Sequence, residues 1–234
     1  MSKETGFKIY KDIDRPSQEI IDQYKEFVVA NISDSMGKLF TMDYRVKPVY
    51  QPMGKICGPA FTVQARPGDN LLSLKAIELA KPGDVIVISG MGDTNFSVWG
   101  GFMSIMAVNK GIAGVVTDGI VRDVAQSQET KLPIYAIGVT PAAPTKEGTG
   151  QINTTISCGG VVVEPGDIVC ADEDGVVVVP LGEAEKVIDA VHLRIQKENE
   201  WMEIVKKGGT IAIDSAIELI DAKNAEIIDK RKPE

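Results

Sequence analysis

An arginine and an aspartate stand side by side at a point where a strand ends and a helix is expected to begin. In GVVTDGIVRDVAQSQ, residues 114–128, the first residues favour a buried strand, Asp118-Gly119 favours a turn, and Arg122 and Asp123 precede a helical run. Backbone N–H groups and the helix dipole favour small anions at such a place. The guanidinium can hold a carboxylate or polarise a carbonyl oxygen. The aspartate offers one hard oxygen to Mg²⁺ or Mn²⁺, so the pair could bind a 2-oxo acid.

The same two residues also fit a purely structural interpretation. Asp123 stands where an N-cap residue is expected, and its side chain could accept a hydrogen bond from the first turn of the following helix. Arg122 would then lie on the surface. The pattern alone leaves both interpretations open.

The remaining reactive side chains narrow the chemistry. The only histidine, His192, lies in a helical run with no second histidine and no nearby serine or cysteine nucleophile, and we interpret it as a surface-helix residue. Acid–base chemistry then falls to carboxylates, Arg, Lys, Tyr or a metal-bound water. The three cysteines have no CxxC spacing, so neither a disulfide framework nor a zinc site is predicted. They are interpreted as small core residues: Cys57, Cys158 and Cys170.

Two other enzyme classes are disfavoured. Gly90 and Gly92 follow a buried strand, as in a dinucleotide-binding loop, but Asn95 occupies the position of the third glycine. A Schiff-base lysine would need an apolar pocket to depress its pKa. The lysines considered for that role flank strands or helix ends instead: Lys55, Lys81, Lys110 and Lys131.

Composition limits the class of protein. A chain of 234 residues can form one sizeable core, and we expect one domain. The net charge of −8 and the pI near 4.9 argue against nucleic-acid or anionic-membrane binding, because phosphates would be repelled. The apolar runs of about five to eight residues are far shorter than the roughly 20 needed to span a bilayer. The N-terminus has no signal-peptide core, and we expect a cytoplasmic protein.

The periodicity of apolar residues predicts an α/β layer. A helix signal over residues 16–38 begins at Pro16-Ser17, and a β-rich stretch follows at 55–70. A helix is predicted over Leu71–Leu79, a strand over 81–90, a helix over 97–111 with Gly111 as its stop, and a strand over 113–119. Short strands then continue to residue 181. We therefore predict an α/β core over 1–181 and a C-terminal helical arm over 182–234 that packs on a neighbouring subunit.

Three longer runs identify a family. Residues 66–89 (RPGDNLLSLKAIELAKPGDVIVIS), 99–123 (WGGFMSIMAVNKGIAGVVTDGIVRD) and 159–180 (GGVVVEPGDIVCADEDGVVVVP) resemble the RraA-like family. That family includes the class II 4-hydroxy-4-methyl-2-oxoglutarate and 4-carboxy-4-hydroxy-2-oxoadipate aldolases. The resemblance extends from about Ile32 to Gly208. It implies a layered α/β/β swivelling-type fold, assembled as a trimer or a hexamer with active sites between subunits.

The resemblance also assigns roles to residues. It implies that Arg122 binds the pyruvyl carboxylate and carbonyl, and that Asp123 is the direct ligand of a divalent metal, Mg or Mn. In the aldolase branch a C-terminal glutamate reaches a metal-bound water in the adjacent subunit, and Glu198 stands at the matching place, with Glu200 as a weaker candidate. Glu198 could also be a solvated helix residue. Backbone N–H groups for the substrate are expected from Gly100, Gly101, Phe102 and Met103.

The implied activity is retro-aldol cleavage of a 4-hydroxy-2-oxo acid to release pyruvate, with oxaloacetate decarboxylation through the same pyruvate enolate. The expected partners are a small 2-oxo acid and further copies of the chain, without nucleic acid or membrane. The alternative is a non-catalytic regulator of the RraA branch, which binds an RNA-degrading endonuclease. That branch is shorter and lacks the glutamate-bearing helix, so the arm favours the enzyme.

Gly101 departs from the family pattern. Many characterised aldolases carry an acidic residue at this position, where it helps to hold the water shell of the metal, and glycine cannot do so. The glycine could widen the pocket for another substrate, or it could mark a weak aldolase that retains some decarboxylase activity. We expect weaker metal affinity than in relatives with the acid, with pyruvate or oxalate still bound.

Overall fold

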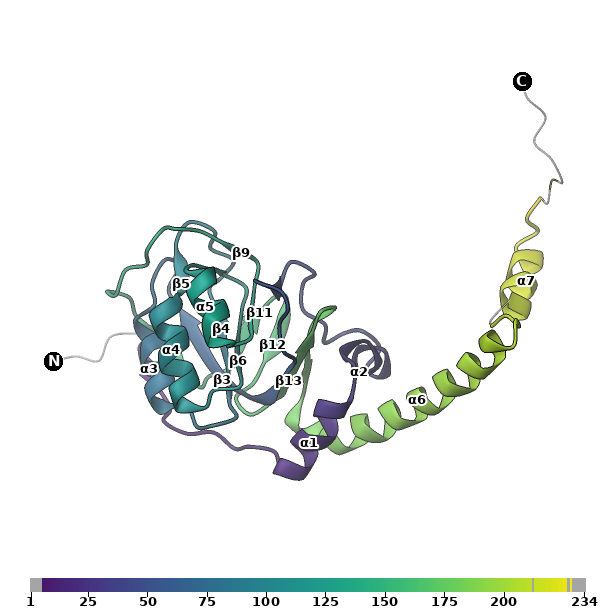
Figure 1. Ribbon diagram of the computed structural model, residues 1–234, viewed down its shortest axis with the longest axis horizontal. Coiled ribbons are helices and arrows are strands. Elements are labelled where there is room, and N and C mark those ends of the chain that lie inside the picture. The colour runs from purple at the N-terminus through teal and green to yellow at the C-terminus, as the bar shows by residue number, and fades with distance from the viewer. Residues whose placement is uncertain (1–5, 212, 227, 229–234) are drawn as a thin grey trace, which may run out of the picture. The chain divides into compact units, whose positions relative to one another are not determined.

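The computed structural model describes residues 6–211, 213–226 and 228, coloured along the chain in Figure 1. The chain divides into two compact units, Met1–Val191 and His192–Glu234. The first unit contains every strand that the structure describes. The second contains the rest of one long helix and a shorter helix.

The helices of the first unit, in chain order, are α1 Gln18–Glu26, α2 Val29–Ser35, α3 Leu71–Leu79, α4 Gly101–Lys110 and α5 Val124–Thr130, with a 3-10 turn at Leu181–Glu183. Helix α6, Ala184–Lys206, begins in the first unit and continues into the second, which also holds α7, Ile213–Ala222. The strands are β1 Lys8–Ile9, β2 Lys47–Pro48, β3 Ile56–Ala65, β4 Val85–Ser89, β5 Ser97–Trp99, β6 Gly114–Thr117, β7 Ile120–Val121, β8 Ile134–Ala136, β9 Gly138–Val139, β10 Gly150–Ile152, β11 Ile156–Cys158, β12 Val161–Val163, β13 Ile168–Asp172 and β14 Gly175–Val179.

A mixed sheet runs through the first unit in the order β1-β10-β3-β4-β6-β8-β2. Its centre is parallel, from β3 through β4 and β6 to β8. The first half of the long strand β3 also pairs antiparallel with β13, which pairs with β14. A small parallel sheet, β5-β7-β9, lies beyond the ends of these strands. Every residue of β4 is buried, as expected for a parallel strand covered on both faces.

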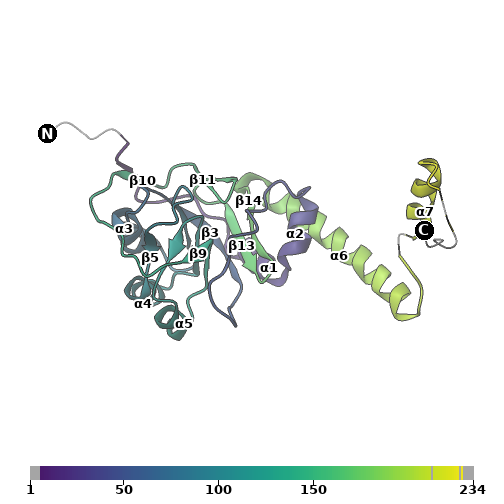
Figure 2. The ribbon, with the colours of Figure 1, turned by 90° about the horizontal axis from the view of Figure 1, so that it is seen from above.

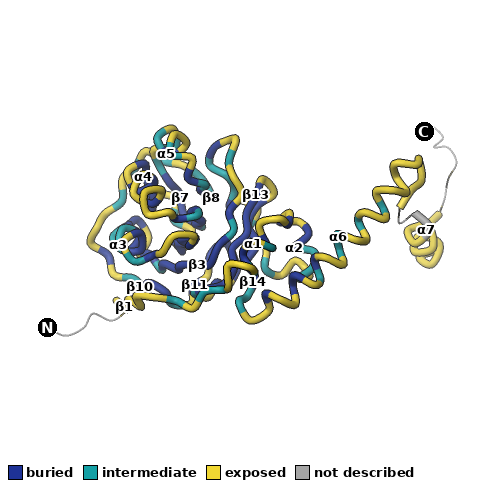
Figure 3. The backbone as a smooth tube through the Cα atoms, turned by 60° about the horizontal axis from the view of Figure 1, so that its bottom comes forward, coloured by how far each residue is buried: buried dark blue, intermediate teal, exposed yellow. Residues whose placement is uncertain are grey.

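Alternating side chains of the central strands build two cores. Ile86 and Ile88 belong to a cluster with Trp99 and Met103 on the side of α3 and α4. Val85 and Val87 belong to a second cluster with residues of β11 to β14. Because side chains alternate along β4, this strand contributes to the cores on both faces of the sheet. Figures 2 and 3 show α3, α4 and α5 on one side and strands β13 and β14 on the other. In Figure 3 much of the strand backbone between them is dark blue, which marks buried residues. The predicted α/β/β layered fold is confirmed.

The helix α3 is confirmed at the predicted bounds, and Gly111 ends α4 in the left-handed region at φ +79°. The helix predicted over 97–111 was wrong at its start, because Ser97–Trp99 forms strand β5. The Ser97 N–H donates to the Ala142 carbonyl, and the strand pairs with β7. Tertiary pairing therefore replaces the local helical preference at these three residues.

The helix signal over 16–38 corresponds to two helices, so its interpretation as one element is corrected. Ser17 caps α1 as predicted, because its side chain accepts from the Ile20 N–H. Phe27 and Val28 are extended, and α2 then begins at Val29. Asp172, at the end of β13, accepts a 3.0 Å hydrogen bond from the Val29 N–H. A carboxylate distant in sequence thus satisfies the new helix start.

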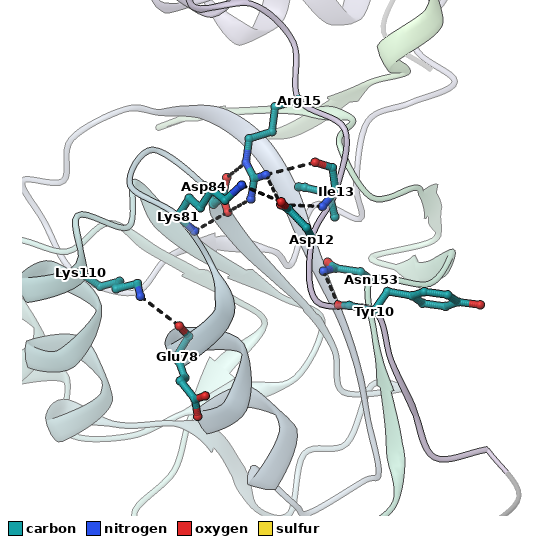
Figure 4. A network of polar contacts seen from close by, with 9 residues as sticks. All are labelled: Tyr10, Asp12, Ile13, Arg15, Glu78, Lys81, Asp84, Lys110 and Asn153. Carbon is teal, nitrogen blue, oxygen red and sulfur yellow. Dashed lines mark hydrogen bonds and ion pairs between the residues drawn. The ribbon is translucent and has the colours of Figure 1, made fainter.

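An ion-pair network ties the N-terminal segment to the sheet (Figure 4). The Arg15 guanidinium donates from Nε and from its Nη2 to the two oxygens of Asp84, at 2.8 and 2.7 Å. Asp12 accepts from both Arg15 and Lys81. The hydrogen bonds to Asp84, followed by those to Asp12, raise the pKa of Arg15. The buried Asp84, which the sequence places only in a turn, therefore anchors the chain before α1.

The start of α6 packs within the first unit. Val187, Ile188 and Val191 are buried, and the Tyr24 hydroxyl donates to the Ala184 carbonyl at 2.7 Å. The amphipathic spacing of Val187, Ile188, Val191 and Ile195 predicts that the arm packs on a neighbouring subunit. The first three of these residues are instead buried within the first unit, so that argument is corrected, whereas the packing itself stays a prediction. Among the described residues, no helix is long and apolar enough to cross a membrane.

Candidate functional site

Arg122 and Asp123 lie where β7 leads into α5. The Arg122 N–H donates to the Trp99 carbonyl at 3.0 Å, which places the arginine beside the end of β5. Asp123 occupies the N-cap position of α5 with φ +56° and ψ +43°, yet its side chain accepts no hydrogen bond from α5. Its Oδ2 instead accepts from the Gly101 N–H at 3.1 Å and lies 3.3 Å from Arg122 Nε. The interpretation of Asp123 as a side-chain cap of α5 is therefore wrong.

Gly100 allows this close approach. A Cβ atom at Gly100 would lie 3.0 Å from Asp123 Oδ2 and 3.2 Å from Arg122 Nε, closer than ordinary contacts. The following residues form the first turn of α4, whose N–H groups lack intrahelical acceptors. Asp123 takes the N–H of Gly101, which leaves those of Phe102 and Met103 for a ligand. The residues expected to offer backbone N–H groups therefore lie directly against the charge pair of Arg122 and Asp123.

The charge pair faces a pocket of about 190 Å³. A pocket of about 400 Å³ exists elsewhere, beside the 3-10 turn, but no guanidinium and no first turn of an α-helix line it. The smaller pocket is therefore the candidate site, because cation, carboxylate and N–H groups meet there. Gly101 lies beside this pocket and does not line it. The lining residues are Asn70, Leu74, Ser97, Trp99, Gly100, Phe102, Met103, Arg122, Asp123, Pro144 and Lys146.

Sequence analysis did not identify Asn70 and Lys146 as residues that line this pocket. Lys146 adds a second cation to the pocket wall. Asn70 is buried, and its Oδ1 has no hydrogen-bond partner among the described residues, while its Nδ2 lies 3.4 Å from Met103 Sδ. Asn70 directly follows the RPGD turn signal, whereas Lys146 stands in a loop without periodicity. Asn70 and Lys146 lie far from Arg122 in the sequence, and the fold places all three around one pocket.

Asp69 fixes the loop that carries Lys146. Its Oδ2 accepts from Thr145 Oγ1 at 2.8 Å, from the Glu147 N–H at 2.6 Å and from the Gly148 N–H at 2.9 Å. Burial alone would raise the pKa of Asp69, but hydrogen bonds from Leu71 and from this loop lower it below its usual value. The ionised carboxylate therefore holds one wall of the pocket.

Buried hydroxyl groups join the two helices beneath the site. The Trp99 indole donates to Ser104 Oγ at 3.0 Å, and this oxygen lies 2.9 Å from Ser127 Oγ. Ser104 belongs to α4 and Ser127 to α5, and all three side chains are buried. Figures 1 and 2 both show these helices side by side. The chain of polar contacts fixes the helix that follows Asp123 relative to the helix that starts at Gly101.

The structure places Glu198 in the second unit, on α6. Its Oε1 accepts from Arg194 Nε at 2.8 Å, and Glu200 accepts from Gln196 at 3.4 Å. Lys197 lies 4.9 Å from the centroid of the Trp201 ring. His192 is exposed on the same helix, as expected. The role of Glu198 in a neighbour's site stays a prediction.

The chemistry of the donors around Asp123 suits a hard divalent cation better than zinc. Within the part of the chain that the structure describes, no three His, Cys, Asp or Glu side chains gather in a group that could hold an ion. Asp123 is a single carboxylate with a partly exposed side chain. It suits a hard ion such as Mg²⁺, which keeps several waters and takes further oxygens from its substrate. It does not suit a tetrahedral zinc site.

The space above Gly101 is filled by Gln126. A Cβ atom at Gly101 would overlap the carboxamide oxygen of Gln126 and lie 2.6 Å from its Cδ. The half-buried Gln126 projects from α5 toward the start of α4. An acidic side chain at 101 therefore requires Gln126 to turn away first.

Comparisons with known proteins identify the family of the chain and its fold. The model of the family RraA-like, described as Aldolase/RraA, matches residues 29–178. A Halalkalibacterium halodurans protein, provisionally named 4-hydroxy-4-methyl-2-oxoglutarate aldolase, is 40% identical over 200 residues, covering 86% of this chain and 94% of that protein. An uncharacterized Pseudomonas syringae protein gives a TM-score of 0.76 at 28% identity, covering 85% of this chain and 93% of its own. Streptomyces coelicolor RraAS2, described as an unusual member of the RNase ES inhibitor RraA family, gives 0.71 at 30% identity, covering 80% and 96%.

Proposed function

This chain belongs to the RraA-like family, and we propose that it is a metal-dependent lyase that cleaves a 4-hydroxy-2-oxo acid to release pyruvate. The family resemblance of the sequence is thereby confirmed. The observation that supports the reaction is the convergence of Arg122, Asp123 and the first N–H groups of α4 on one pocket. Oxaloacetate decarboxylation is a second proposed activity, because it passes through the same pyruvate enolate.

Arg122 and the start of α4 bind the pyruvyl end of the substrate. The guanidinium fork pairs with the carboxylate and reaches the adjacent carbonyl oxygen. The N–H groups of Phe102 and Met103 donate to the same end, where the helix dipole favours negative charge. As the C3–C4 bond breaks, charge grows on the carbonyl oxygen, and fixed donors stabilise it without having to reorganise.

Asp123 is the residue that would hold Mg²⁺ or Mn²⁺ in this site. The ion, when bound, supplies a second positive charge next to the substrate carbonyl oxygen. The hydrogen bond from Gly101 and the proximity of Arg122 fix the direction of the carboxylate. An ion held by Asp123 would therefore lie on the same side of the pocket as Arg122.

Glu198 of a neighbouring subunit accepts the proton of the 4-hydroxyl group in this proposal. The hydroxyl carbon becomes the carbonyl of the leaving 2-oxo acid, and the electrons of the broken bond form the pyruvate enolate. A proton then returns to C3 and completes pyruvate. Glu198 is the glutamate at the family position for this step, and its carboxylate is held on α6 by Arg194.

Lys146 suggests a substrate with a second carboxylate. It lines the pocket with Arg122, so the wall offers two cations to a ligand of this size. One cation binds the pyruvyl carboxylate, and the other remains for a carboxylate at the far end. Substituted 4-hydroxy-2-oxo diacids and oxaloacetate both meet this requirement.

The site is proposed to be shared in a homotrimer or homohexamer. Phe102 lines the pocket and yet is 74% exposed, and Ile105 and Met106 extend this apolar surface along α4. Such exposed apolar side chains next to a pocket are typical of surfaces that another chain covers. A second copy would cover the pocket and bring its arm to it.

A second candidate function is the binding and inhibition of an RNA-degrading endonuclease. It is favoured by the fold similarity to RraAS2, whose family is described by that activity. A regulator of this kind has no need for Arg122 and Asp123 to face a pocket. The two functions therefore predict opposite effects of changes in the pocket.

A substrate panel tests the proposal. Purified protein with Mg²⁺ or Mn²⁺ is given 4-hydroxy-4-methyl-2-oxoglutarate, 4-carboxy-4-hydroxy-2-oxoadipate and oxaloacetate, and pyruvate is measured. We expect turnover of at least one hydroxy diacid and its loss in Asp123→Asn. No pyruvate from any of the three, together with inhibition of RNA cleavage that survives Asp123→Asn, would establish the regulator instead.

A further inference from the structure

Two of the three cysteines meet across neighbouring strands. Cys57 on β3 and Cys170 on β13 are direct partners in the antiparallel register. Their sulfur atoms are 3.8 Å apart, although 113 residues separate them in the sequence. The spacing of Cys57 and Cys170 in the sequence follows no cysteine motif, so this pairing could not be predicted from the sequence.

The backbone geometry at this pair suits a covalent link. Pro59, two residues along β3, has no N–H group, so its pair with Ile168 cannot be a hydrogen-bonded one. Pairs alternate along an antiparallel ladder, and the pair of Cys57 and Cys170 is therefore also non-hydrogen-bonded, with Cα atoms about 4.5 Å apart. Disulfides span Cα distances of about 4.4–6.8 Å. Side-chain rotation alone can thus bring the sulfurs to the bond length of about 2.05 Å.

A reagent can reach these sulfurs. Both cysteines line a pocket of about 200 Å³, together with Tyr24, Phe27 and other residues. Cys57 is partly exposed, whereas Cys170 is buried. Because Cys57 is the more exposed of the two sulfurs, it reacts first. The hydrogen bond to Cys57, followed by burial, raises the pKa of Cys170 well above its usual value, which keeps Cys170 protonated until the second step.

We propose that Cys57 and Cys170 form a redox-active dithiol that closes to an intrachain disulfide with a small disulfide as oxidant. The Cys57 thiolate attacks one sulfur of the reagent, which forms a mixed disulfide and releases one thiolate. Cys170 then loses its proton to solvent and attacks Cys57 Sγ, which releases the second thiolate. Two protein thiols are oxidised, and one reagent disulfide is reduced to two thiols.

This site is separate from the proposed catalytic pocket. The pocket at the dithiol and the pocket at Arg122 share no lining residue. The dithiol proposal therefore does not depend on the proposed lyase activity, and each can be tested without the other. Cys158 is the internal control, because it is fully buried, bonds to the Ile88 carbonyl and lines neither pocket.

Mass spectrometry of the whole folded chain tests the proposal. Protein is incubated with bis(2-hydroxyethyl) disulfide, quenched with acid, and examined by intact mass, thiol titration and peptide mapping. We expect the loss of two of three thiols, the mass loss of two hydrogen atoms, and a peptide link between Cys57 and Cys170. Reduction with dithiothreitol should restore three thiols.

Variants separate the two steps. Cys158→Ala should oxidise like the wild type, Cys170→Ser should stop at one mixed disulfide on Cys57, and Cys57→Ser should keep its thiols. Retention of three thiols in the folded wild type overturns the proposal, as does a link that involves Cys158 or a second chain. The result for the wild type and Cys158→Ala decides the question. The proposal therefore remains testable even if Cys57→Ser or Cys170→Ser fails to fold.

Discussion

Asp123 owes its direction to an unusual backbone conformation. At φ +56° it is a non-glycine residue in the left-handed region, which few residues adopt and which is found at functional sites. In this conformation its carboxylate turns from α5, which it precedes, to the first N–H of α4. The sequence indicated the residue types of the pair and the glycines beside them. It could not indicate which helix the carboxylate serves, because that depends on strands β5 and β7 meeting.

Arg122→Lys is expected to lower kcat by roughly 10²-fold or more, as for the loss of one fixed donor to a developing oxyanion. The charge remains, but the planar fork that matches the carboxylate and carbonyl is lost. Arg45→Lys is the matched control, since Arg45 pairs with Asp43 at an exposed place outside the pocket. Steady-state kinetics checks this. An unchanged kcat with a raised KM would mean that Arg122 only binds substrate.

Gly101→Asp is expected to tighten Mg²⁺ or Mn²⁺ binding only when Gln126 makes room. The carboxamide of Gln126 occupies the position of the new Cβ, so Gly101→Asp alone has to displace it. The double variant with Gln126→Ala should bind metal more tightly than either single variant and release pyruvate faster. Calorimetric metal titration of the four proteins measures this. Equal affinities in all four would show that an acid at 101 is dispensable.

At the scale of elements, helices and strands that depend on local sequence signals could be predicted, whereas those that depend on contacts with distant residues could not. Leu71–Leu79 and the stop at Gly111 follow from periodicity and from the tolerance of glycine for positive φ. The break before Val29 depends on Asp172, far along the chain, and strand β5 depends on β7. The pattern of neighbouring residues in the sequence cannot reveal partners that lie far along the chain. The same holds for Lys146, which reaches the pocket only through the loop that Asp69 holds.

Asp69→Ala is expected to raise KM about tenfold with little change in kcat, because the loop N–H groups lose a buried acceptor worth ~1–3 kcal/mol. The altered loop no longer presents Lys146 to the substrate. Substrate kinetics and hydrogen exchange at Glu147 and Gly148 measure the effect. An unchanged KM with faster exchange would show that the loop does not form a substrate contact.

The same carboxylate predicts a pH dependence of stability. The pKa of Asp69 is lower in the folded chain than its usual value of 3.8, so its contribution is fully present above about pH 4. That contribution is lost as the pH falls through the folded pKa. Urea unfolding of wild type and Asp69→Ala should therefore differ most at neutral pH and converge in acid.

At the scale of the whole molecule, the proposed active site combines Asp123 of one copy of the chain with Glu198 of another. Asp123→Asn and Glu198→Gln should each be nearly inactive, yet co-expressed chains that mix at random should regain about a quarter of wild-type activity in a cyclic oligomer. One intact site needs Asp123 from one subunit and Glu198 from the next. Activity of the mixed sample measures this, with sedimentation to establish the oligomer. No recovery in a mixed oligomer would place both residues in one subunit or remove Glu198 from the site.

The most direct test of the central claim is pyruvate release before and after the removal of divalent metal. Protein dialysed against EDTA should lose turnover of 4-hydroxy-4-methyl-2-oxoglutarate and oxaloacetate, and added Mg²⁺ or Mn²⁺ should restore it. Asp123→Asn should bind metal weakly and remain inactive at the same concentrations. Undiminished turnover in excess EDTA would contradict the account, because Arg122 and the start of α4 would then suffice without a cation at Asp123.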